Sequence, residues 1–156
     1  MKLQKATVFA LYAVLELAAA PGRQRTVVEI AEKYGISAHH LAKVLRDLGR
    51  AGIVDAVRGV GGGYRFTGNA KRLTLMDVIR LFEEPSAEAD LPLPSRDGQD
   101  IAEGLRFVLA ELDAQTGATL RSISLSTMLK LIARRPWESQ GAATPARRAQ
   151  AGRRSR

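Results

Sequence analysis

The sequence contains no cysteine among its 156 residues. Disulfides, thiol catalysis and clusters ligated only by cysteine are therefore excluded. Aromatic residues are also scarce at 5%, whereas 46% of the residues are hydrophobic, which is ordinary for a soluble globular chain. No run approaches the roughly 18 uncharged apolar residues of a membrane span. The length and composition indicate one compact domain with an appendage.

The first 22 residues resemble a weak signal peptide, with two lysines before an apolar run. However, Glu16 interrupts that run, and arginines follow Pro21. The apolar residues keep helical spacing, which predicts a core helix in a cytoplasmic protein. The face expected to be buried consists of Leu3, Val8, Leu11, Val14, Leu15 and Ala18.

The net charge of +8 is unevenly distributed. Residues 1–84 hold 13 basic against 8 acidic residues, a charge of +5, and residues 134–156 hold 7 against 1, a charge of +6. Residues 85–133 hold 4 against 7, a charge of −3. This asymmetry favours a polyanionic partner for the front of the chain and for its tail.

Two short helices joined by a tight turn are predicted between residues 26 and 51. Thr26 and Glu29 have capping-box spacing, and Gly35 ends the first helix. Ser37 is a suitable N-cap for the second helix, which has a regular apolar stripe. Such a pair is a helix-turn-helix, although an ordinary helical hairpin would look the same.

A hairpin follows directly, with strands expected at 53–57 and 64–67. Between them lies the stretch RGVGGGYRF, residues 58–66. No lysine follows its glycines, and tyrosine occupies the sixth place of a possible GxGxxG, so both nucleotide-loop interpretations fail. A hairpin after a helix-turn-helix instead makes the unit a winged helix.

The remainder of the chain predicts a short helix at 73–84, with Thr74 and Asp77 as cap and acidic partner, and a long helix from residue 100 to about 120. A last short helix is expected at roughly 126–134. The fold class is mainly α with a small β-hairpin wing. The expected organisation is a winged-helix domain at 1–84, a connector at 85–99, dimerisation helices at 100–135 and a basic disordered tail at 136–156.

Five stretches together resemble a known family over about residues 1–133: MKLQKATVFALYAVLELA, IAEKYGISAHHLAKVLRDLGRAGIV, VRGVGGGYRF, LTLMDVI and ISLSTML. The family comprises the bacterial winged-helix regulators grouped with the iron–sulfur cluster assembly regulator and the nitric-oxide-sensitive repressor. The resemblance implies a DNA-binding homodimer on a pseudo-palindromic operator, held together by the long C-terminal helix. The expected dimer residues are Ile101, Leu105, Val108, Leu109, Leu112 and Leu120.

One departure of the chain from this family is large. Sensing members carry three cysteines before the long helix and bind an iron–sulfur cluster there, whereas this chain has EEPSAEADLPLPSRDGQD. No metal or other cofactor is therefore expected. The signal is then a small molecule, a partner protein or protein abundance.

The second helix of a helix-turn-helix presents its N-terminal residues to base edges in the major groove. His39 and His40 lie there, and Lys43 follows one turn later. A metal site at the two histidines is disfavoured, because adjacent helical residues point about 100 degrees apart and a third strong ligand is lacking.

In the wing, the resemblance assigns Arg58 to the adjacent minor groove. The glycines serve a tight turn, a close approach to phosphates, or both; four of them beside an arginine favour contact. Tyr64 is expected to pack the wing onto the domain. The full set of expected DNA-binding residues is Lys2, Lys5, Thr26, Ser37, His39, His40, Lys43, Arg58, Gly61, Gly62 and Tyr64.

The sequence thus favours a homodimeric transcriptional regulator, most simply a repressor, that binds a double-stranded DNA operator. The alternative is a protein-interaction adaptor that retains the winged-helix fold, but only DNA binding requires the wing arginine and the basic front. An enzyme is the weakest interpretation, since no thiol or paired acid–base constellation is present.

Overall fold

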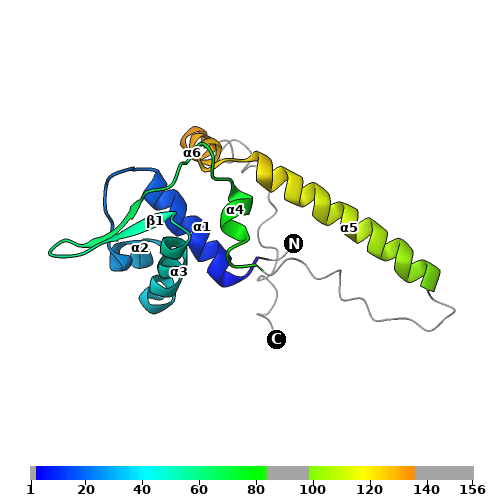
Figure 1. Cartoon of the computed structure of the whole chain (residues 1–156), viewed down its shortest axis with the longest axis horizontal. Helices are drawn as coiled ribbons and strands as arrows, with labels where there is room; N and C mark the ends of the chain where they lie inside the picture. Colours follow the sequence, from blue (N-terminus) through cyan, green and yellow to red (C-terminus); the bar gives the residue numbers. More distant parts are fainter. Residues whose placement is uncertain (1–2, 84–98, 136–156) are drawn as a thin grey trace, which may run out of the picture.

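The computed structural model describes residues 3–83 and 99–135, which form helices and one β-hairpin. The predicted fold class, a mainly α winged helix, is confirmed. Lys2, residues 85–98 of the expected connector and the expected tail at 136–156 lie outside the described residues. The elements are α1 Lys5–Ala18, α2 Val27–Tyr34, α3 Ala38–Arg50, β1 Val54–Val57, β2 Gly63–Phe66, α4 Leu75–Ile79, α5 Gln99–Ser122 and α6 Leu125–Arg134 (Figure 1).

Helix α1 runs through the middle of the winged-helix part and contacts α2, α3, β2, α4 and α6 (Figure 1). The predicted helix is present, but the face predicted for burial was partly wrong. Of that set only Val14 and Ala18 are fully buried, while Leu3, Val8, Leu11 and Leu15 are partly buried. Because neighbours surround the helix, its most enclosed positions include small residues that allow close approach. These positions are Thr7, Ala10, Ala13, Val14, Leu17 and Ala18.

The helix-turn-helix formed by α2 and α3 follows the sequence signals. The Thr26 hydroxyl accepts from the Glu29 amide at 3.1 Å, and the Glu29 carboxylate accepts from the Thr26 amide at 2.6 Å. This capping box satisfies two backbone donors that a helix N-terminus otherwise leaves unpaired. Gly35 has a φ of 62°, the left-handed conformation that ends α2 and turns the chain toward α3.

The wing is an antiparallel hairpin in which Val54 pairs with Phe66 and Val57 with Gly63. Both strands differ from the predicted ranges by one residue. Ile53 lies before β1 because its carbonyl accepts from the amides of Thr67 and Gly68, both at 3.1 Å, and not from a regular ladder partner. Thr67 correspondingly lies beyond β2.

Helix α4 is shorter than the predicted helix at 73–84, but its predicted capping box, Thr74 with Asp77, is present. The segments before α4 and α6 pair as an isolated antiparallel bridge, with the Leu75 amide donating to the Ile123 carbonyl at 2.9 Å. This pairing holds α6 against the winged-helix part, while α5 extends away from it (Figure 1). Helix α5 is slightly longer at both ends than predicted.

The N-terminus of α1 is capped from a distant part of the chain. Its N-cap, Gln4, makes no side-chain cap of its own. Instead, the Glu83 carboxylate accepts from the Gln4 amide at 2.7 Å and from the buried Thr7 hydroxyl. Both hydrogen bonds lower the pKa of Glu83 from its ordinary value, and an anion is favoured at the positive end of a helix. Glu83 therefore ties the segment after α4 to the start of α1.

We expect Glu83→Ala to lower the free energy of unfolding by about 1–3 kcal/mol, because a helix cap is lost and a buried hydroxyl is left unpaired. Urea unfolding at pH 7 and fixed protein concentration measures this. Glu32→Ala is the matched control, since Glu32 is exposed on α2 and its side chain has no hydrogen bond within residues 3–83 and 99–135. Equal stabilities of the two variants would show that the cap contributes nothing.

Candidate nucleic-acid interface

Helix α3 has one buried and one exposed face. Leu41, Val44, Leu45 and Leu48 are buried in the core. His39, His40 and Lys43 are exposed on the other side. The structure therefore places the three side chains expected to contact DNA on one solvent-facing surface.

Ser37 occupies the predicted N-cap position with an extended backbone, at φ −61° and ψ 123°. The predicted N-cap is confirmed by its position and backbone conformation, although its side chain makes no capping hydrogen bond. The residue is exposed at the start of α3. Thr26, by contrast, uses its hydroxyl in the α2 capping box.

The two histidines do not converge on a common point. Their ring centroids lie 6.1 Å apart, and the ring planes are tilted by 53°. In the part of the chain that the structure describes, no three histidine, aspartate or glutamate side chains gather as metal ligands would. The arrangement suits two independent hydrogen-bonding groups on a helix surface.

The local structure explains why glycine is required at each of the four wing positions. Gly59 and Gly61 have φ values of 108° and 74°, which side-chain-bearing residues rarely adopt. A Cβ on Gly62 would lie 2.5 Å from the Val57 carbonyl oxygen, and one on Gly63 would overlap the Arg25 carbonyl. The inference that four glycines favour a DNA contact over a turn therefore does not hold. At Gly62 the requirement for glycine comes from close packing and not from a positive φ.

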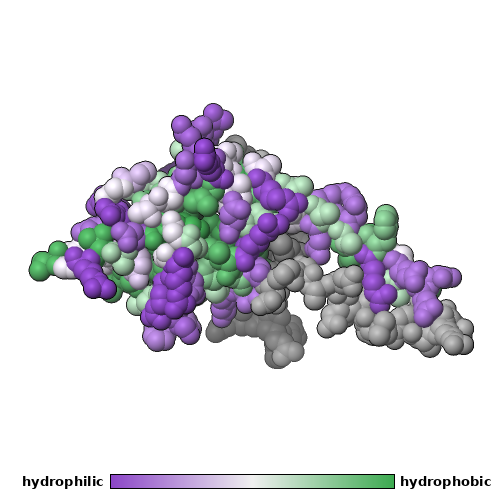
Figure 2. All heavy atoms as spheres, viewed as in Figure 1, coloured by the Kyte–Doolittle hydropathy of each residue, from purple (hydrophilic) through white to green (hydrophobic). Residues whose placement is uncertain are grey.

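At the tip of the wing, two side chains are turned out to solvent. Arg58 is exposed and makes no hydrogen bond or ion pair with any residue in 3–83 or 99–135. Val60 is fully exposed, and the left end of the molecule, where the hairpin lies in Figure 1, is apolar in Figure 2. An arginine without a partner on a protruding hairpin can enter a groove of DNA without breaking an existing contact.

Tyr64 and Arg25 anchor the wing to the domain. The Arg25 amide donates to the Tyr64 carbonyl at 2.9 Å, and the Tyr64 amide donates to the Arg25 carbonyl at 2.8 Å. The Tyr64 ring packs against the core, as expected. This extra pairing was not predicted, because a single bridged residue leaves no alternating pattern in the sequence.

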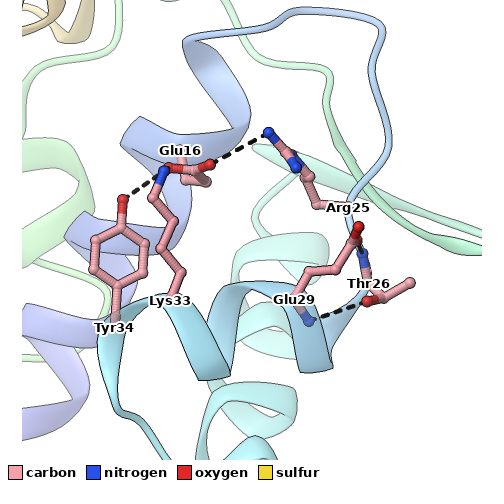
Figure 3. A network of polar contacts seen from close by, with 6 residues as sticks. All are labelled: Glu16, Arg25, Thr26, Glu29, Lys33 and Tyr34. Carbon is pink, nitrogen blue, oxygen red and sulfur yellow. Dashed lines mark hydrogen bonds and ion pairs between the residues drawn. The ribbon is translucent and has the colours of Figure 1, made fainter.

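A polar cluster around Glu16 joins α1, α2 and the segment before α2 (Figure 3). The Glu16 carboxylate accepts from Lys33 Nζ and from the Tyr34 hydroxyl, both at 2.7 Å, and lies 3.7 Å from Arg25. The Glu16 side chain is only 11% exposed. Tyr34 also stacks on Tyr12, with ring centroids 4.9 Å apart.

Two opposing effects act on the pKa of Glu16. Burial raises it, but the hydrogen bonds from Lys33 and Tyr34 and the nearby positive charges outweigh burial, so the pKa lies below its ordinary value of 4.5. Burial, followed by the bond to Glu16, raises the pKa of Tyr34 to about 12. At neutral pH the cluster therefore contains a carboxylate and a protonated phenol. The sequence shows Glu16 only as a break in an apolar run and does not predict this cluster.

The seam residues of α5 expected at a dimer contact divide into two groups. Ile101, Leu105, Val108 and Leu112 are each at least 51% exposed, although they are large and apolar. Leu109 and Leu120 are partly buried within the chain. Phe107, which was not predicted, is 74% exposed on another side of the helix.

The winged helix can now be compared with known proteins. Residues 3–131 match the profile of Rrf2, a family described as iron-dependent transcriptional regulators. The chain belongs to the Rrf2 family. It is 49% identical over 155 residues to the HTH-type transcriptional regulator BadM of Rhodopseudomonas palustris, with 98% of each protein covered. As an Rrf2 member, it is a bacterial transcriptional regulator of the helix-turn-helix type and not an enzyme.

Solved structures of Rrf2-like regulators share the fold. Oxidized CymR of Staphylococcus aureus has a TM-score of 0.67 and 24% identity, covering 83% of this chain and 96% of that one. IscR of T. potens has a TM-score of 0.62 and 24% identity, covering 97% and 94% respectively. The likeness to these proteins concerns the fold.

The Rrf2 family is described as iron-dependent, but this chain contains no cysteine that could ligate iron. The residues present therefore do not fit a cysteine-ligated cluster. Among residues 3–83 and 99–135, none of the helices has the length and hydropathy required to span a bilayer.

We expect Glu16→Gln to lower the free energy of unfolding at pH 7 by about 1–2 kcal/mol, since hydrogen bonds to a charged acceptor are lost and half-exposed Lys33 limits the effect through solvent screening. A lowered folded-state pKa means that the carboxylate stabilises the protein fully above the unfolded pKa. This stabilisation is lost as the pH falls through the folded pKa.

The stability difference between wild type and Glu16→Gln should therefore shrink below the ordinary pKa of 4.5. Urea unfolding at a series of pH values measures it, with Glu32→Gln as the control for removing an exposed carboxylate from α2. A difference independent of pH would show that ionised Glu16 is not the stabilising species.

Proposed function

We propose that this Rrf2 regulator binds a double-stranded DNA operator through the exposed face of α3 and the tip of the wing. His39, His40 and Lys43 enter the major groove, with Ser37 beside them, and Arg58 enters the adjacent minor groove. The exposed, unpaired Arg58 at the end of the hairpin is the observation that carries the proposal. Contacts to the phosphate backbone come from Lys2, Lys5 and the Gly61 amide, whereas the Gly62 amide already donates to the Gly59 carbonyl at 2.9 Å.

Thr26 and Tyr64 have structural tasks in this arrangement. The Thr26 hydroxyl caps α2, and Tyr64 anchors the wing. Each of them supports the DNA-binding surface by holding an element in place. The amides of Thr26 and Tyr64 already donate to the Glu29 carboxylate and the Arg25 carbonyl, so a DNA contact of either residue would use its hydroxyl group.

The proposed active form is a homodimer. The four exposed apolar residues at positions 101, 105, 108 and 112 follow three- and four-residue steps, so they form one seam along α5. A second copy of the helix would remove that seam from water. Two winged helices related by a twofold axis would then meet half-sites one helical turn apart, roughly 34–36 Å along the DNA.

The mode of action proposed is repression in the cytoplasm without an iron–sulfur cluster. A dimer on two adjacent half-sites covers promoter DNA and so excludes other proteins from it. The lack of cysteine supports a cluster-free regulator. An effector, if the regulator has one, is then a small molecule or a partner protein, and protein abundance alone can also set operator occupancy.

Arg58→Ala tests the DNA contact. With the best duplex selected by the protein from a randomised pool, the affinity should fall by roughly 1–3 kcal/mol, the size of one good groove contact. Circular dichroism should be unchanged, because Arg58 is exposed and unpaired. The affinity is measured by fluorescence anisotropy at fixed salt.

Two further wing variants complete this test. Arg65→Ala is the matched control, since Arg65 is paired with Asp55 at 3.2 Å in the same hairpin. Gly62→Val should damage the wing itself, because its Cβ would meet the Val57 carbonyl. If Arg58→Ala binds like wild type while Gly62→Val fails, the stretch 58–66 is a turn and not a DNA contact.

Leu112→Asp should convert the dimer to monomers and abolish specific operator binding, as should Leu105→Asp. A charge in an apolar seam has neither water nor a partner, and a single half-site binds weakly. Sedimentation velocity measures the oligomeric state. Ala110→Asp places the same charge on the opposite, exposed side of α5 and should leave the dimer intact; dimers of Leu112→Asp would refute the seam.

A further inference from the structure

The structure sorts the basic side chains of the winged helix by whether a carboxylate neutralises them. Four are paired: Arg25 and Lys33 with Glu16, Arg50 with Asp47 and Arg65 with Asp55. On α3 and the wing, the cations that make no ion pair or hydrogen bond with any residue in 3–83 or 99–135 are Lys43, Arg46 and Arg58. The DNA contacts proposed above do not include Arg46.

Arg46 lies on the same exposed face of α3 as His39, two turns later. Seven residues at 3.6 per turn bring the two side chains to within roughly 20 degrees of one direction and about 10 Å apart along the axis. That separation corresponds to about three base pairs at 3.4 Å each. With the first turn of α3 at the base edges, Arg46 reaches the wall of a groove that is roughly 12 Å wide.

We propose that Arg46 is a phosphate-binding residue at the far end of the α3 contact, and that the contact ends there. This inference rests on the proposed DNA-binding function. An exposed guanidinium without a protein partner gives up no ion pair when it meets a phosphate, and the fork of N–H groups matches phosphate oxygens.

The next basic residue on this face is Arg50, one turn beyond Arg46. Its guanidinium lies 3.3 Å from the Asp47 carboxylate. The pair carries no net charge, and the carboxylate repels a neighbouring phosphate. Arg50 therefore neutralises no phosphate, although it lies on the same face as Arg46.

The salt dependence of affinity distinguishes these two arginines. Each neutralised phosphate contributes about 0.9 to the slope of log K against log salt. Arg46→Ala should lower that slope by about 0.9 for each protomer bound, and to the same extent on the selected duplex and on an unrelated duplex of equal length. Arg46→Lys keeps the charge and should retain the slope.

Arg80→Ala controls for the loss of one positive charge. Arg80 is exposed and directly follows α4, and α1 lies between α4 and α3 (Figure 1). The slope of Arg80→Ala should equal that of wild type. Asp47→Asn frees Arg50 and should raise both the affinity and the slope. Circular dichroism of each variant confirms that the fold is retained.

An unchanged slope for Arg46→Ala overturns the phosphate contact, and an altered base preference would make Arg46 a base-reading residue instead. An unchanged slope for Asp47→Asn would refute the claim that the pairing of Arg50 with Asp47 makes the α3 contact end at Arg46. If the wild-type protein selects no duplex at all, the proposed function itself fails, which is distinguishable from both results.

Discussion

Burial of α1 is the constraint on which the rest of the structure depends. This helix packs against α2, α3, β2, α4 and α6, and its enclosed positions include Ala10 and Ala13. Small residues let neighbouring backbones approach closely, so their packing sets the distances between elements that are far apart in sequence. The elements of the proposed DNA-binding surface, α3 and the wing, derive their relative orientation from this shared support.

Polar contacts then fix the ends and joints of that framework. Glu16 connects α1 to α2 and to Arg25, whose backbone pairs with Tyr64 in the wing. Glu83 closes the other end of α1. Hydrogen bonds lower the pKa of both carboxylates, so the geometry of the proposed DNA-binding surface depends on ionised groups outside that surface. The same pairing that stabilises these joints also neutralises several of the cations around that surface.

Much of the fold was predictable because it rests on local signals. Capping boxes, a left-handed glycine after α2 and apolar residues at three- and four-residue steps act over a single turn, so the sequence shows them directly. The winged helix, His39, His40 and Lys43 on one face of α3, and Arg58 on the wing all follow from such signals. The buried face of α1 was partly wrong because a helix enclosed by neighbours has no single apolar stripe.

The sequence by itself determined the element order, the Rrf2 motifs and the absence of cysteine ligands, since each depends on neighbouring residues or on composition. Only the tertiary structure decided which charges are neutralised and why each wing glycine is required. Glu16 and Lys33 are 17 residues apart, and Gln4 and Glu83 are 79 apart. Gly63 is constrained by the backbone of Arg25 on another segment. Contacts between distant segments leave no periodic pattern along the chain, and for that reason they become visible only when the chain is folded.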